Sequence, residues 1–184
     1  MVAMLQTKST RFEAIAAVAA LAALAGGIGG TRASALAQEA PAAVSEPVWE
    51  VLGSATNFGV APGLTLELAR FTWTPGYAQA LHTHNAVDVV YVVSGEVAWR
   101  VEGGEALVVR PAASGTPTPP ETLAPGNEAL LGVGDAIVFD YGYQQLWHAG
   151  RTVGNAPVVM LFADLYDPGR PITVYAEDGA TPTP

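Results

Sequence analysis

The chain lacks cysteine, has only three histidines, and carries a single lysine, Lys8. The absence of cysteine excludes disulfide bonds, thiolate nucleophiles and cysteine-ligated zinc. No segment after the N-terminal region shows a sustained apolar repeat of 3.6 residues, which argues against an amphipathic helical domain. A folded core must therefore be built from strands, and its stability must come from apolar burial and any bound metal.

The first 37 residues have the features of an export signal. Lys8 and Arg11 precede a short apolar run at residues 14–24, and an Ala-Leu-Ala sequence at 35–37 has the form of a cleavage site. An uncleaved anchor and an organelle transit peptide are the alternatives, but the run is short for a membrane span and poor in arginine. We expect residues 1–37 to be removed, giving a secreted or periplasmic protein without stable membrane insertion.

Acidic residues dominate the remainder of the chain. Cleavage after residue 37 would remove Glu13 and the three basic residues Lys8, Arg11 and Arg32, and would leave 16 acidic and 5 basic residues. Such a surface repels nucleic acid and anionic membranes, so we expect a small-molecule substrate or ligand as the partner. The oligomeric state stays open, with a homodimer as one option.

Short apolar segments separated by Gly and Pro predict an all-β fold, a sandwich or a barrel. Residues 38–47 are expected to be a flexible lead-in, 48–176 a single β-barrel domain and 177–184 a disordered tail. The expected strands are residues 48–52, 64–73, 96–102, 106–110, 135–139, 157–166 and 172–175. A loop is expected at 57–63, a hairpin turn at Gly103-Gly104 and a surface loop at 111–127.

The main functional signal is a glycine-framed stretch from Gly76 to Gly95. It contains His82 and His84 at spacing i, i+2, and Asp88 follows with the same parity. If the stretch is one extended strand, all three side chains point to one face. Apolar residues on both parities of 87–93 predict that both faces are covered. The histidine pair alone could be two ordinary polar side chains, but His148 follows a second apolar strand signal and supplies a third imidazole.

These residues resemble the first motif of the cupin family. Gly76, His82, His84 and Gly95 occupy its glycine and histidine positions, and Asp88 stands where the family has glutamate. The resemblance implies a small cupin of the single-domain, cupin 2 type. Its fold would be a double-stranded β-helix, or jelly-roll, barrel with one metal site inside.

The second cupin motif is matched less closely. Gly134, Gly142 and His148 resemble its frame, but Asp140 stands where proline is usual and Thr152 where asparagine is usual. In addition, five residues rather than two separate Gly142 from His148. The resemblance covers about residues 62–168 and implies that His82, His84, His148 and Asp88 form the metal site.

The ligand set suits one divalent transition metal, Fe, Mn, Zn, Ni or Cu, with open positions for chemistry. We expect a metal-dependent oxidoreductase of dioxygenase-like type, with isomerase-like chemistry, a non-catalytic metal or ligand binding barrel and a metal-free barrel as alternatives. No residue stands out as a catalytic base or nucleophile. Because Asp is one methylene shorter than Glu, we expect Asp88 to act through a water or a histidine N–H rather than to bind the metal directly, with direct ligation as the alternative.

Overall fold

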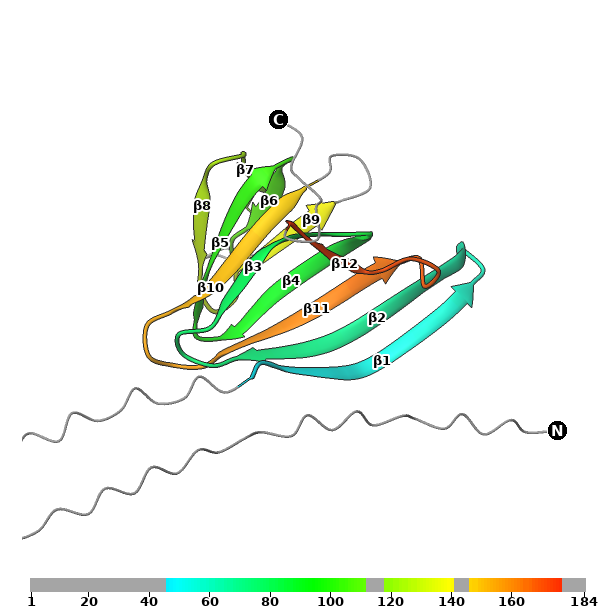
Figure 1. The fold of residues 1–184 in the computed structure, drawn as a ribbon, viewed down its shortest axis with the longest axis horizontal. Coiled ribbons are helices and arrows are strands. Elements are labelled where there is room, and N and C mark those ends of the chain that lie inside the picture. Colours follow the sequence, from blue (N-terminus) through cyan, green and yellow to red (C-terminus); the bar gives the residue numbers. More distant parts are fainter. Residues whose placement is uncertain (1–45, 112–117, 141–145, 177–184) are drawn as a thin grey trace, which may run out of the picture. The chain divides into compact units, whose positions relative to one another are not determined.

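The computed structural model describes residues 46–111, 118–140 and 146–176, and the secondary-structure elements in these ranges are all β-strands. The strands form two antiparallel sheets, and the chain alternates between them (Figure 1). The expected leader 1–37, most of the lead-in and the expected tail lie outside the described residues. No helix in the described ranges is long and apolar enough to cross a membrane.

The larger sheet has seven strands in the order β1-β2-β11-β4-β9-β6-β7. Its strands are β1 (Val48–Phe58), β2 (Ala61–Trp73), β4 (Ala86–Ser94), β6 (Ala106–Val109), β7 (Glu121–Leu123), β9 (Ala136–Asp140) and β11 (Val158–Tyr166). The smaller sheet has the order β12-β3-β10-β5-β8. Its strands are β3 (Ala78–His84), β5 (Glu96–Gly103), β8 (Glu128–Leu131), β10 (Trp147–Val153) and β12 (Thr173–Tyr175). This double-sheet alternation is the jelly-roll arrangement, so the expected fold class is confirmed.

The inner faces of the two sheets pack against each other. Trp73 of β2 lies 5.3 Å from Trp99 of β5, and Phe139 of β9 stacks 4.4 Å from His148 of β10, measured between ring centroids. Gly150 of β10 allows this packing, because a Cβ there would lie 2.7 Å from both the Trp73 and the Trp99 ring. The buried aromatic and aliphatic side chains of the two faces form one core.

The histidine stretch is not one extended strand, which corrects the first expectation. The chain bends at Asn85, so His82 and His84 lie on β3 of the smaller sheet and Asp88 lies on β4 of the larger sheet. Asn85 holds the bend, since its backbone N–H donates to the Ile172 carbonyl at 2.9 Å and its side-chain amide donates to the Pro171 carbonyl at 2.6 Å. Asp88 consequently approaches the histidines from the opposite sheet.

Three further expectations about local structure are wrong. Residues 57–63 mostly extend the β1–β2 hairpin, leaving a turn at Gly59 and Val60. Gly103-Gly104 does not close a hairpin, because β5 and β6 belong to different sheets. Within the expected loop 111–127, residues 121–123 form the short strand β7, which pairs with β6, and residues 112–117 lie outside the described residues. In each case strand pairing across the fold outweighed the local turn signal.

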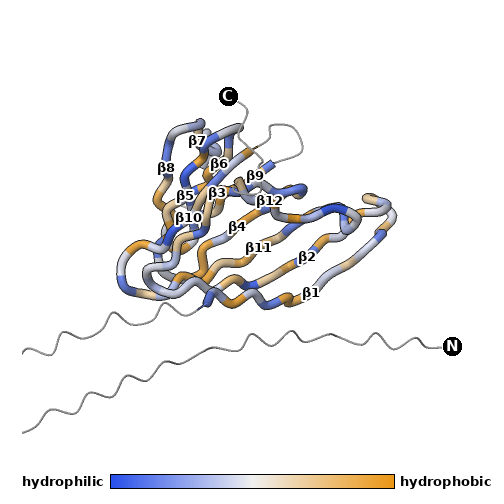
Figure 2. The backbone as a smooth tube through the Cα atoms, viewed as in Figure 1, coloured by the Kyte–Doolittle hydropathy of each residue, from blue (hydrophilic) through white to orange (hydrophobic). Residues whose placement is uncertain are grey.

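One face of β4 is exposed, contrary to the expectation that both are covered. Val90 and Val92 are fully buried, whereas Val89, Tyr91 and Val93 are each more than 40% exposed on the outer face of the seven-stranded sheet. Hydrophobic residues also recur along β2 and β11, as Figure 2 shows. The apolar run therefore reflects strand propensity on the outer face and core packing on the inner face.

Candidate metal centre

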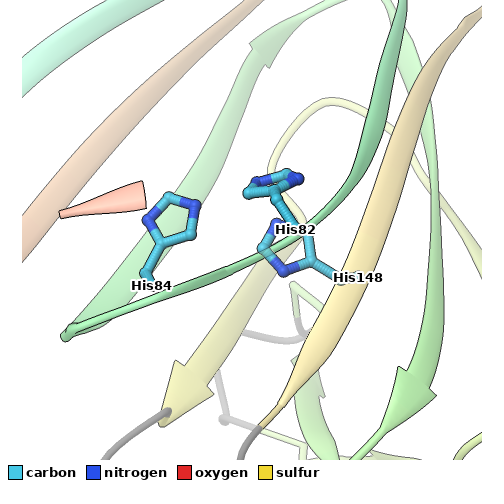
Figure 3. A group of neighbouring side chains, drawn as sticks. All are labelled: His82, His84 and His148. Atoms are coloured by element: carbon cyan, nitrogen blue, oxygen red, sulfur yellow. The ribbon is translucent and has the colours of Figure 1, made fainter. Parts of the chain in front are cut away.

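Strand register brings the three histidines together. His82 and His84 are two residues apart on β3, so their side chains share the inner face of the smaller sheet. His148 on β10 is the cross-strand partner of His82. One ring nitrogen from each histidine lies within 4.8 Å of the others, and the three rings face a common point (Figure 3). These three histidines, all within the described residues, could hold a metal ion.

His82 is oriented by the backbone. Its Nδ1 lies 2.7 Å from the carbonyl oxygen of Ala80, so Nδ1 carries the proton and donates it to that carbonyl. In this tautomer Nε2 bears a lone pair. Nε2 is buried and has no hydrogen-bond partner among the residues that the structure describes. A buried polar atom without a partner is costly, and a metal bond would satisfy it, so the site fits a metal.

His84 is oriented by a carboxylate from the other sheet. Its Nδ1 lies 3.1 Å from Oδ2 of Asp88, whose side chain is 1% exposed. An imidazole that donates one N–H to a carboxylate presents the other nitrogen for ligation, which is the usual arrangement behind metal-bound histidines. Asp88 is not part of the converging nitrogen group. Its position favours the orienting role over direct ligation.

His148 is packed against aromatic rings of the core. Its ring stacks on Phe139 at an interplanar angle of 12° and meets the edge of Trp99 at 5.1 Å. Burial lowers its pKa well below the ordinary value, with further lowering from His82 and His84. Burial also lowers the pKa of His82 and of His84 to about 4. All three imidazoles are therefore neutral near pH 7, which is the form that binds metals.

A cavity of about 250 Å³ opens between the two sheets at this centre. The smaller sheet contributes the three histidines, Gln79, Trp99, Thr173 and Tyr175, the larger sheet contributes Trp49, Phe71, Phe162 and Asp164, and Ile172 precedes β12. Tyr175 pairs with His82 across β12 and β3, and their rings are 5.5 Å apart. Aromatic side chains from both sheets therefore line the cavity beside the histidines.

Asp164 is a cavity residue that sequence reasoning missed. It is 3% exposed and is the cross-strand partner of Asp88 in the β4–β11 pair. Burial, followed by the charges of Asp88 and Glu67 and a hydrogen bond with Asp88, raises the pKa of Asp164 to about 8. Near pH 7 the pair therefore holds one proton, which Asp164 donates to the Asp88 carboxylate. The only sequence signal was an acidic residue inside the apolar segment 157–166.

No protein-family model matches the sequence, and no curated protein matches it. Solved structures similar to the chain include an oxalate decarboxylase, with TM-score 0.42 and 20% identity over 74% of this chain and 30% of the other. A Bacillus subtilis oxalate decarboxylase variant gives TM-score 0.42 and 20% identity over 72% of this chain and 28% of the other. Vicilin from Capsicum annuum gives TM-score 0.37 and 12% identity over 56% and 24%. The chain spans less than a third of the length of these proteins.

Structural similarity at these TM-scores and identities does not assign an activity to this chain. The fold of the chain is defined by its own strand order, which is that of a jelly roll, a class that includes the cupins. The three convergent imidazoles make it a jelly roll with a candidate mononuclear metal centre.

Proposed function

We propose that the chain is a metal-binding cupin that holds one divalent transition metal, Fe, Mn, Zn, Ni or Cu, through His82, His84 and His148. The observation that carries this proposal is the buried Nε2 of His82, which faces two other neutral imidazoles and has no hydrogen-bond partner among the described residues. A metal held by three imidazoles keeps positions open for substrate, and such a cation supplies Lewis acidity or, for redox-active metals, electron transfer.

The surrounding residues prepare the site for that chemistry. The Ala80 carbonyl and the Asp88 carboxylate fix the tautomers of His82 and His84, and the stack on Phe139 fixes the ring of His148. Aromatic side chains line much of the cavity, and such apolar surroundings strengthen electrostatic interactions beside them. Beside the histidines, the proton shared by Asp164 and Asp88 can be donated to or accepted from a bound molecule.

The activity that we propose is a metal-dependent, dioxygenase-like oxidoreduction of a small organic molecule. Three neutral nitrogen ligands and a cavity lined by aromatic side chains support it, since an oxygen-binding metal needs open positions and room for a substrate beside them. The test is to load the purified chain anaerobically with each of Fe²⁺, Mn²⁺, Ni²⁺, Cu²⁺ and Zn²⁺ and measure oxygen uptake with single-ring phenols and enediols.

Metal-dependent oxygen uptake that disappears in His148→Ala and persists in Glu102→Gln is the expected result. Glu102 is the control because it pairs with Arg100 on β5 and does not line the cavity. Stoichiometric metal binding without uptake for any metal would favour a non-catalytic binding barrel. Absence of metal binding would overturn the proposal.

We also propose that the protein acts outside the cytoplasm after removal of residues 1–37. The charged start, the apolar run and the Ala-Leu-Ala site support export. N-terminal sequencing of material recovered from outside the cytoplasm should begin at Gln38. Recovered protein that begins at Met1 would contradict this proposal.

A further inference from the structure

The end of the cavity formed by the larger sheet is a wall of three aromatic rings. Trp49 lies 5.0 Å from Phe71 and 5.3 Å from Phe162, and Phe71 lies 5.7 Å from Phe162. All three side chains line the cavity. Trp49 is 41% exposed, so it marks the solvent end of this wall. Flat, apolar ring surfaces of this kind favour a planar apolar ligand.

Asp164 adds a carboxyl group to this end of the cavity. Asp164 follows Phe162 by two residues on β11, lines the cavity and is 3% exposed. One of its oxygens, Oδ1, is buried and has no hydrogen-bond partner among the described residues. Because an unsatisfied buried acceptor costs free energy, the site is built to receive a hydrogen-bond donor from a bound molecule.

The size of the cavity matches a single ring. An apolar protein cavity of roughly 150 Å³ holds benzene. The volume here is about 250 Å³, part of which the metal and its open positions occupy. The space therefore fits a benzene ring with one or two small substituents.

Charge selects among single-ring molecules. From residue 46 onward the chain has five arginines and no lysine, and none of these arginines lines the cavity. Four are held in ion pairs elsewhere, Arg70 with Glu50, Arg100 with Glu102, Arg110 with Asp135 and Arg151 with Glu128. At the Asp164 end of the cavity, an anionic substituent would be repelled by the charge that Asp164 shares with Asp88 and would meet no cationic side chain. A cationic substituent would be repelled by the bound metal, so a neutral donor is favoured at Asp164.

We propose, on the basis of the proposed metal centre, that the cavity binds a single-ring phenol. Its ring packs against Trp49, Phe71 and Phe162, and its hydroxyl donates a hydrogen bond to Oδ1 of Asp164. The class is defined by a neutral hydroxyl donor on one aromatic ring. Benzoates, benzylamines and ethers of the same size lack either the neutral charge or the donor.

The experiment measures ligand binding by calorimetry at pH 7 to the full chain loaded with Zn²⁺, which is redox-inert and prevents turnover. The probes are 4-methylphenol, 4-methylanisole, 4-methylbenzoate and 4-methylbenzylamine. We expect 4-methylphenol to bind roughly tenfold or more tightly than each of the others, the difference that one buried hydrogen bond gives. Equal affinity for the phenol and the anisole, or tightest binding of the benzoate or the amine, would overturn the inference.

The variant Asp164→Leu keeps the side-chain shape and removes the acceptor. It should lower the affinity for 4-methylphenol roughly tenfold and leave that for 4-methylanisole within about twofold. Glu102→Gln, on the exposed side of β5, is the control and should change neither. Unchanged phenol affinity in Asp164→Leu would refute the assigned role. If this variant does not fold, the phenol-to-anisole ratio in the wild-type chain decides.

Zinc content, measured on every sample, separates this inference from the proposed function. A wild-type chain that retains no zinc contradicts the metal centre itself. A chain that retains one zinc but binds no probe, or binds all four alike, contradicts only the phenol inference.

Discussion

The two sheets contribute different chemistry to the same cavity. The smaller sheet supplies three neutral imidazoles from β3 and β10, whereas the larger sheet supplies two carboxyl groups and three aromatic rings from β1, β2, β4 and β11. The larger sheet contacts the histidines through the hydrogen bond between His84 and Asp88 and the stack of Phe139 on His148. Metal affinity should therefore depend on the smaller sheet and ligand affinity on the larger one, and substitutions can test whether the two separate.

The largest effect is expected from His82→Ala. The substitution removes a metal-binding nitrogen and leaves a cavity in the core, so metal affinity should fall by more than about a hundredfold. A metal titration monitored by calorimetry measures this change in affinity. Gln79→Ala, a substitution on the same strand, should leave metal affinity within about threefold. Similar losses in both variants would show that the strand, rather than the imidazole, controls binding.

A smaller effect on metal affinity is expected from Asp88→Asn, because Asp88 lies on the larger sheet and acts through a histidine of the smaller sheet. The amide keeps the shape of the side chain but weakens the hydrogen bond that orients His84. Metal affinity should fall by about 10- to 100-fold, less than in His82→Ala. The same titration measures it. A loss equal to that of the histidine variant would make Asp88 a direct ligand.

In the metal-free protein, the buried histidines of the smaller sheet should lower the free energy of unfolding as the pH falls. The pKa values of His82 and His84 are lowered from 6.5 to about 4 by burial, so the unfolded chain binds protons first as pH falls. Their contribution to the free energy of unfolding is present above pH 6.5 and is lost between 6.5 and 4. Urea unfolding across this window should show the loss, and His82→Gln should show a shallower slope. An identical slope in the variant would contradict the shifted pKa.

Asp164 of the larger sheet should have the opposite effect and should lower the free energy of unfolding as the pH rises. The pKa of Asp164 is raised from 3.8 to about 8 by burial and by Asp88, so its contribution is present below pH 3.8 and is lost as pH rises to about 8. Asp164→Asn removes this ionisation and should be more stable than the wild type at pH 9, by roughly 1–2 kcal/mol. The difference should shrink toward pH 5. Thermal unfolding of metal-free samples at both pH values checks it.

The histidine centre could be predicted from the sequence because its signal is local. A spacing of two residues places His82 and His84 on one face of any strand, and a chain with only three histidines leaves His148 as the third ligand candidate. The bend at Asn85 could not be predicted in this way. It depends on hydrogen bonds to Pro171 and Ile172, which lie far along the chain.

Asp164 shows where sequence reasoning ends. Its neighbours in the chain are apolar, and its role follows from the pairing of β11 with β4, which places it opposite Asp88. That register links segments about 76 residues apart and has no local motif. The outer face of β4 was misjudged for a related reason, because a valine-rich strand has the same pattern whether its second face is covered or exposed.

The most direct test of the metal centre is its stoichiometry in the wild-type chain and in His148→Ala. Both proteins are purified without metal, dialysed against a slight excess of Zn²⁺ and analysed for zinc. The three-histidine site predicts one zinc for each wild-type chain and a large loss in the variant, with the fold retained by circular dichroism. Equal zinc content in the two proteins, or no zinc in either, would contradict it.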